Sequence, residues 1–154
     1  MSEMVRTLQK KFRFETAHRL AKGYVGKCAN IHGHSWNGHI EVEYLEMDEF
    51  DMGVDYAILG RYCKILEAEL DHKLILWEGD EDLIKSLQAQ GQVVVTTRKN
   101  PTSEALADLI FRQVDAMIKD ELVKLNKGVI YRLKSVTIEE TCTTRCTVTR
   151  DNLK

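Results

Sequence analysis

The sequence predicts an α+β fold, in which two main helices cover one face of an antiparallel four-stranded sheet. Segments near both ends of the chain alternate apolar and polar residues, which is typical of half-buried antiparallel strands. Two longer segments between them repeat apolar residues at three- and four-residue steps, the period of a helix. The predicted order is strand, strand, helix, helix, strand, strand. With no internal repeat or linker, we expect one domain over residues 1–154.

Composition narrows the class of protein. The chain is 44% hydrophobic and 30% charged, enough for an ordinary core, and its net charge of −2 gives no basic field for nucleic acid. No apolar run is long enough to cross a bilayer, and the first ten residues lack a signal-peptide core. We therefore expect a cytoplasmic protein with no membrane partner, whose cysteines are reduced.

The first two strands are predicted over residues 5–20 and 34–45, joined by a loop over 21–31. In the first, Phe12, Phe14 and His18 share one face by the two-residue alternation. In the second, Trp36, Ile40, Val42 and Tyr44 point one way, and His32 and His34 have the same parity. All three histidines are therefore expected on the inward face of the sheet.

The two main helices are predicted from their first residues and their periodicity. Asp55 is the expected N-cap of a helix ending at Leu70, in which Cys63 is a core residue. The segment from Asn100 to Glu104 starts the other, which runs to about Leu125 with Gly128 just past it. Residues 80–90 suggest a short helix, and residues 93–95 a brief β run.

The last two strands are predicted over residues 129–141 and 146–150. In the first of them, Val136, Ile138 and Glu140 share the inward face. A carboxylate on a core-facing position needs a partner. Either an arginine or a ligand with two adjacent N–H donors would supply one.

A metal site is the first functional hypothesis, because three of the five histidines and one of the four cysteines fall within residues 27–39. His32 and His34, two residues apart on a strand, lie roughly 6.6 Å apart on one face, so both imidazoles can reach one ion. The alternative is two polar residues at a strand entrance. Pairing of the first two strands brings His18 opposite them, and three imidazoles with an open position are typical of catalytic zinc.

Three further groups carry open alternatives. Cys28 precedes His32 by four residues and is either a fourth zinc ligand, a thiolate base beside the metal, or a passive thiol. Asp71 and His72 form either a proton-transfer pair or an ordinary helix end. His39 has the outward parity and is predicted to lie on the surface. Packing is the preferred role of Cys142 and Cys146.

These pieces resemble the 6-pyruvoyl-tetrahydropterin synthase superfamily, most closely its 6-carboxy-tetrahydropterin synthase branch. The matching segments, in family order, are Phe14-Glu15-Thr16-Ala17-His18-Arg19-Leu20, Cys28-x3-His32-Gly33-His34, Asp55-Tyr56-x2-Leu59, Leu70-Asp71-His72, Asn100-Pro101-Thr102-Ser103-Glu104 and Glu140-Thr141-Cys142. They cover nearly the whole chain. The Cys28-to-His32 spacing is that of the carboxy branch.

The resemblance implies a tunnelling fold (T-fold), a homohexamer with active sites at subunit interfaces, and Zn²⁺ held by His18, His32 and His34. It implies a catalytic set of Cys28, Asp71 and His72. It also implies a pterin site that includes Glu140 and the Thr102-Ser103-Glu104 segment.

The expected reaction converts 7,8-dihydroneopterin triphosphate to 6-carboxy-5,6,7,8-tetrahydropterin, acetaldehyde and triphosphate, on the pathway to queuosine. The alternatives are a 6-pyruvoyl-tetrahydropterin synthase, which eliminates triphosphate only, and a non-catalytic zinc module closed by Cys28. The candidates for binding triphosphate are Arg19, Lys22, Lys27 and Arg98. Two departures from the family are the residues Trp36 to His39 and the length of the segment between His72 and Asn100.

Overall fold

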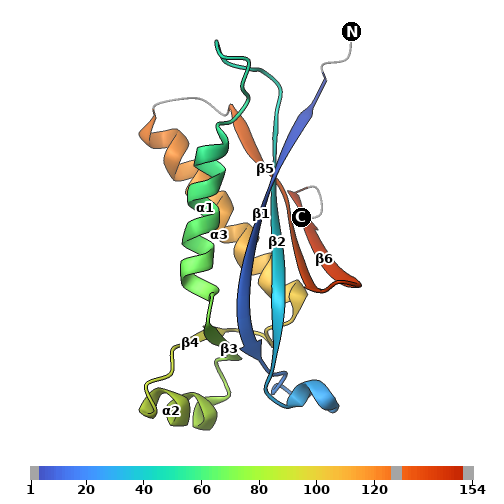
Figure 1. Cartoon of the computed structure of the whole chain (residues 1–154), viewed down its shortest axis with the longest axis vertical. Helices are drawn as coiled ribbons and strands as arrows, with labels where there is room; N and C mark the ends of the chain where they lie inside the picture. The colour runs from blue at the N-terminus through green and yellow to red at the C-terminus, as the bar shows by residue number, and fades with distance from the viewer. Residues whose placement is uncertain (1–3, 126–129, 151–154) are drawn as a thin grey trace.

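The computed structural model describes residues 4–125 and 130–150 (Figure 1). Its elements, in chain order, are β1 (Arg6–His18), a short 3₁₀ helix (Lys27–Ala29), β2 (His32–Tyr44), α1 (Tyr56–Leu70), β3 (Lys73–Trp77), α2 (Glu81–Ala89), β4 (Val94–Thr97), α3 (Ser103–Lys124), β5 (Tyr131–Thr141) and β6 (Thr144–Thr149). The predicted helix end near Leu125 agrees with α3, and Gly128 lies outside the described residues. None of the described helices is both long and apolar enough to span a membrane.

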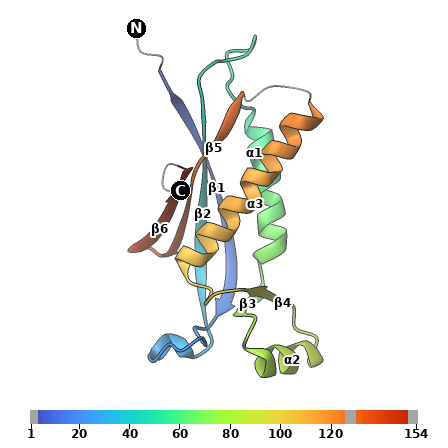
Figure 2. The ribbon, with the colours of Figure 1, turned by 180° about the vertical axis from the view of Figure 1, so that it is seen from behind.

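The six strands form one sheet in the order β4-β3-β1-β2-β5-β6, and α1 and α3 lie along one face of it (Figures 1 and 2). The pairs β1–β2, β2–β5 and β5–β6 are antiparallel, whereas β3 pairs in parallel with both β1 and β4. The predicted α+β class is confirmed. The purely antiparallel four-stranded sheet is not, because two parallel strands extend it and make it mixed.

The missed strand, β3, is short and carries no alternation. Its sequence, Lys-Leu-Ile-Leu-Trp, is a nearly continuous apolar run that directly follows α1. Parallel strands are covered on both faces and therefore read as apolar runs without period two. Alternation therefore does not reveal β3, which is the partner strand of the predicted β run at 93–95.

The register of β1 and β2 sets the faces of the sheet. It runs unbroken from Arg6 opposite Tyr44 to His18 opposite His32. Residues directly opposite each other in an antiparallel pair point to the same face. The helix-covered face therefore carries Phe14 and Trp36, both fully buried and stacked with ring centroids 5.9 Å apart, and continues into the three histidines. This confirms the predicted inward parity.

The helices begin where their capping residues predicted. The Asp55 carboxylate accepts a hydrogen bond from the Ala57 N–H at 2.7 Å, and the Thr102 hydroxyl accepts one from the Ala105 N–H at 3.3 Å. Both satisfy backbone donors that the first helical turn leaves free. Cys63 is 4% exposed in the core, as predicted, and burial raises the pKa of its thiol to about 11.

Gly38 makes room for an aromatic ring within the sheet. It lies opposite Phe12, and a Cβ atom added to it would lie 2.1 Å from that ring. Phe12 is only 2% exposed, so its ring has no free space to move into. Gly38, one of the residues at which the chain departs from the family, thus leaves the space that the Phe12 ring fills.

We expect Gly38→Ala to destabilise the protein by about 1–3 kcal/mol, because the new methyl group overpacks the Phe12 ring. Denaturant unfolding measures the change. The same substitution at Gly60, within α1 and with nothing within 4 Å of an added Cβ, is the matched control. There, Ala should stabilise by about 0.5–1 kcal/mol through helix propensity. Equal stability of Gly38→Ala and wild type would refute the packing argument.

Candidate metal centre

Three histidines and one glutamate converge at one end of the sheet. His18 ends β1, His32 and His34 begin β2, and Glu140 lies near the end of β5. One potential ligand atom from each lies within 4.8 Å of all the others, and residues 4–125 and 130–150 contain no second group of this kind. The His18 side chain is 2% exposed, while the other three are half-buried.

The facing atoms are close together. The Nε2 atoms of His18 and His32 are 3.1 Å apart. The Oε1 atom of Glu140 lies 3.1 Å from Nε2 of His34 and 3.4 Å from Nε2 of His18. The predicted meeting of His18 with His32 and His34 is therefore present in the geometry.

Backbone carbonyls determine what these atoms can do. His18 Nδ1 lies 2.7 Å from the Pro101 carbonyl oxygen, and His32 Nδ1 lies 2.8 Å from that of Asn30. A carbonyl oxygen only accepts, so both Nδ1 atoms carry the proton and both neutral rings present a lone pair at Nε2. His34 Nε2 is buried and makes no hydrogen bond within the described residues.

The Nε2 lone pairs of His18 and His32 thus face each other at 3.1 Å, with the Glu140 carboxylate beside them, and a cation between these acceptors would relieve their repulsion. Burial lowers the pKa of His18 and favours its neutral, metal-binding form, an effect that exceeds the opposing one of the Pro101 carbonyl. Three imidazole nitrogens and a carboxylate oxygen are a ligand set that Zn²⁺ accepts. The four residues could hold such an ion.

The Asn100–Pro101 pair supports the group from outside. Beyond orienting His18, the segment holds the loop after β1, because the Asn100 amide accepts from the Lys22 N–H at 2.9 Å and donates to the Lys22 carbonyl at 3.2 Å. Such outer contacts fix the ring orientation of metal ligands. The sequence predicts a helix start and a family match here but not this supporting role, since backbone carbonyl contacts leave no residue-type signal.

The Thr102-Ser103-Glu104 segment follows directly at the start of α3. The Thr102 hydroxyl serves the helix cap, and Ser103 Oγ lies 3.4 Å from Glu104 Oε2. Hydrogen bonds from its own backbone N–H and from Thr102 hold the pKa of Glu104 below its ordinary value. Glu104 is therefore an ionised acceptor, but its predicted contact with a ligand stays a prediction.

Cys28 stands apart from the four-residue group. It is half-buried on the 3₁₀ helix, and its carbonyl accepts a hydrogen bond from the Leu20 N–H at 2.9 Å. Its sulfur is not among the atoms that converge with the histidines, whereas the Glu140 carboxylate is. This arrangement gives no support to Cys28 as the fourth ligand and leaves its predicted role as a proton-transfer thiol open.

Asp71 and His72 do form a hydrogen-bonded pair. His72 Nδ1 lies 2.8 Å from Asp71 Oδ2, and Asp71 Oδ1 accepts from the Glu15 N–H at 2.7 Å. The Glu15 N–H, followed by the His72 ring, lowers the pKa of Asp71. The His72 side chain is 79% exposed, so its ring is available to a ligand or a partner.

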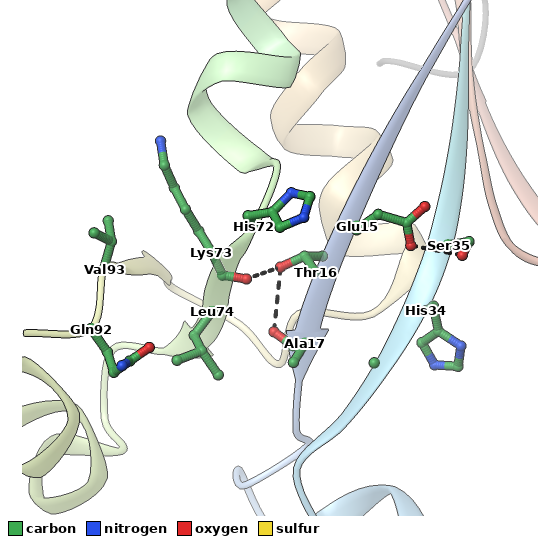
Figure 3. Close-up of a pocket in the computed structure, with 11 residues that line it drawn as sticks. Glu15, Thr16, Ala17, His34, Ser35, His72, Lys73, Leu74, Gln92 and Val93 are labelled. Atoms are coloured by element: carbon green, nitrogen blue, oxygen red, sulfur yellow. Dashed lines mark hydrogen bonds between the residues drawn. The ribbon is translucent and has the colours of Figure 1, made fainter. Parts of the chain in front are cut away.

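This pair lies beside a cavity of about 460 Å³ between β1, β2 and the β3–β4 edge (Figure 3). Glu15, Ser35, His72 and Val93 contribute to its lining. Figure 3 shows the ring of His34 pointing away from that of His72. Within the described chain, no hydrogen bond or ion pair joins Asp71 or His72 to the metal-binding group. His34 of that group does line the same cavity as His72. The catalytic role of Cys28, Asp71 and His72 stays a prediction.

Two other predictions concern charged groups near the site. Arg19, a candidate for binding triphosphate, forms a forked ion pair with Asp80, with both N–O distances 2.6 Å. Two of the guanidinium nitrogens of Arg19 therefore already donate to Asp80. Lys22 places its Nζ 5.6 Å from the centre of the Trp77 ring.

His39 lies on the open face of the sheet, as its parity predicted, but it is half-buried and not a surface residue. Its Nε2 lies 3.3 Å from Glu139 Oε1, which shields it from solvent.

Cys146 packs against the core as expected, and Cys142 is exposed, so packing does not explain Cys142.

The chain is similar in sequence to known proteins. Residues 7–151 match the family described as 6-pyruvoyl tetrahydropterin synthase. A 6-carboxy-5,6,7,8-tetrahydropterin synthase of Rickettsia bellii is 31% identical over 100 residues, 64% of this chain and 72% of the relative. A protein of the same name from Synechocystis is 30% identical over 141 residues, 88% and 87% of the two chains.

Solved structures show the same fold. An uncharacterized protein from Wolinella succinogenes superposes with a TM-score of 0.73 at 19% identity, covering 96% of this chain and 99% of the other. The 6-pyruvoyl tetrahydropterin synthase of Caenorhabditis elegans gives a TM-score of 0.66 at 24% identity, covering 97% and 99%.

We expect the histidine group to bind a divalent transition ion, with Trp36 as its reporter. The Trp36 ring lies edge-on to His18 and His34, with centroids 5.1 and 5.3 Å away. Titrating Co²⁺ into Trp77→Phe, which leaves Trp36 as the only tryptophan, should therefore quench its fluorescence. His34→Ala should weaken Co²⁺ binding at least about tenfold, since even outer-shell changes cost about 10–100-fold. His39→Ala is the control, and an equal loss there would contradict the site.

Proposed function

This chain belongs to the 6-pyruvoyl tetrahydropterin synthase family of enzymes, and on that premise we propose that it is a zinc-dependent 6-carboxytetrahydropterin synthase. The reaction would convert 7,8-dihydroneopterin triphosphate to 6-carboxy-5,6,7,8-tetrahydropterin, acetaldehyde and triphosphate, on the route to queuosine. The carrying observation is that one potential ligand atom from each of His18, His32, His34 and Glu140 lies within 4.8 Å of the other three. The names of the relatives support the choice of branch.

The metal would be held by His18, His32 and His34. When bound, it would polarise the side-chain hydroxyls of the substrate and acidify the adjacent C–H. The Cys28 thiolate would accept a proton from one side of the substrate. His72, oriented by Asp71 at 2.8 Å, would give or take a proton on the other.

The pterin ring would be held at Glu140 and at the Thr102-Ser103-Glu104 segment. A pterin presents an amino group beside a ring N–H, and a carboxylate accepts both in two parallel hydrogen bonds. The lowered pKa of Glu104 keeps a second carboxylate ionised at the start of α3. Fixing the ring would bring the reacting protons within reach of the acid and base.

Two subunits would complete one site. Among the described residues, no hydrogen bond or ion pair joins the Asp71–His72 pair to the metal-binding group, and the His72 side chain is 79% exposed. We therefore propose a homohexamer in which His72 of one subunit serves the metal site of a neighbour. The exposure of the His72 ring supports this assembly.

Product identification tests the branch. We expect the zinc-loaded chain, given 7,8-dihydroneopterin triphosphate, to release acetaldehyde together with triphosphate, measured by mass spectrometry and a coupled alcohol dehydrogenase assay. Triphosphate without acetaldehyde would instead identify a 6-pyruvoyl-tetrahydropterin synthase. Release of neither product by zinc-loaded protein would favour a non-catalytic zinc module.

Cys28→Ala separates catalysis from metal binding. Because general acid–base groups contribute about 10²–10⁴-fold, we expect turnover to fall by about that factor while zinc content is unchanged. Cys142→Ala, which alters an exposed thiol on the turn after β5, should keep full turnover. If Cys28→Ala lost its zinc as well, Cys28 would be a structural ligand.

A further inference from the structure

We propose that the carboxylate of Glu140 is the fourth ligand of the resting metal, and that it must leave this position when the substrate binds. This inference rests on the proposed function for the identity of the incoming ligand. The resting site would then be closed by four protein ligands, and Glu140 would be a displaceable gate.

Strand alternation aims the Glu140 side chain at the histidines. In the pairing of β2 with β5, Asn37 lies opposite Glu139, so Glu140 follows on the face that buries Ile138 and Trp36. The pairing of β5 with β6 shifts register between Glu139 and Thr141, and such irregularities are common beside active sites. Glu139 faces the opposite side of the sheet, where its carboxylate lies 3.3 Å from His39 and 3.9 Å from Arg145.

The distances are those between ligands of one ion. With metal–ligand bonds of about 2.0–2.1 Å, two ligands of a tetrahedral zinc lie about 3.3–3.4 Å apart. The Glu140 oxygen lies 3.1 Å from His34 Nε2 and 3.4 Å from His18 Nε2, and the His18–His32 separation is 3.1 Å. The carboxylate oxygen is therefore about as close to Nε2 of His18 and of His34 as the Nε2 atoms of His18 and His32 are to each other.

Glu140 has no competing partner. In the part of the chain that the structure describes, its ion-pair contacts are to His18 and His34 alone, and neither arginine nor lysine contacts it. The arginine partner considered from the sequence is therefore absent from its surroundings. A half-buried carboxylate, 27% exposed, needs a cation or hydrogen-bond donors. His18 donates its Nδ1–H to Pro101, and His34 Nε2, 3.1 Å from the carboxylate, makes no hydrogen bond, so a metal ion bound by both residues would supply the missing partner.

Exchange follows from these positions. If one oxygen of the Glu140 carboxylate binds the metal, the two oxygens cannot both accept the parallel N–H donors of a pterin ring. Substrate hydroxyls that enter the coordination sphere would have to displace it. The freed carboxylate could then accept the ring N–H groups, so one side chain would serve the resting and the substrate-bound states in turn.

The test uses full-length protein loaded with Co²⁺, whose visible absorption reports coordination. Glu140→Ala and Glu140→Gln are compared with wild type and with Glu139→Gln, the neighbouring glutamate on the other face. We expect Co²⁺ to bind at least about tenfold more weakly to both Glu140 variants, because even the loss of a residue that only supports a ligand lowers metal affinity about 10–100-fold. Glu139→Gln should bind like wild type. Circular dichroism checks that each variant is folded.

Imidazole is the second probe, because it is a neutral metal ligand and does not respond to removal of a negative charge. Added to the Co²⁺-loaded proteins, it should bind at least tenfold more tightly to Glu140→Ala than to wild type, where it must displace the carboxylate. Equal imidazole and Co²⁺ affinities in wild type and both Glu140 variants would overturn the proposal, even if wild type turns over substrate.

A substrate-free crystal structure of the zinc form gives an independent result that needs no variant. A Glu140 oxygen at about 2.0–2.2 Å from zinc supports the gate. A water molecule in that position overturns it while leaving the proposed reaction intact. If wild type binds no divalent ion at all, both the gate and the zinc-dependent function fail.

Discussion

The unbroken register between β1 and β2 is the constraint on which the site depends. It places His18 opposite His32 and Thr16 opposite His34, on the face that buries Phe14 and Trp36. Since side chains alternate along a strand, a slip of one residue would turn β2's histidines to the open face and its apolar residues to solvent. The same hydrophobic burial that fixes the core therefore fixes the metal-binding geometry. The site needs no dedicated scaffold beyond the strand pair.

Much of this could be predicted from the sequence, because it follows from periodicity and capping chemistry. Alternation gave the inward faces of β1 and β2, and the N-caps of α1 and α3 were identified from Asp55 and the Asn100–Glu104 segment. The strand β3 was not predictable, because a buried parallel strand has no alternation. The inward face of Glu140 followed from alternation, but its proximity to the histidines was not predictable, since the pairing of β5 with β2 determines it. Long-range pairing carries no local sequence pattern.

Support around the histidines comes mainly from backbone oxygens. Pro101 and Asn30 supply carbonyls that set which ring nitrogen of His18 and His32 faces the centre. The Asn100 amide ties the loop containing Lys22 to the same segment. Carbonyl contacts of this kind tolerate changes of side chain, provided that the backbone path is kept. The orientation of the histidine rings thus depends on the backbone conformation around the site as much as on the ligands themselves.

The backbone at His72 has a consequence for the evolution of the chain. His72 follows α1 with φ of 56°, a left-handed conformation that costs a residue with a Cβ atom of order 1–3 kcal/mol. Helices commonly end with glycine in this conformation. Glycine at position 72 would relax the backbone but remove the imidazole. Selection for thermal stability and selection for a proton-carrying side chain therefore oppose each other at this residue.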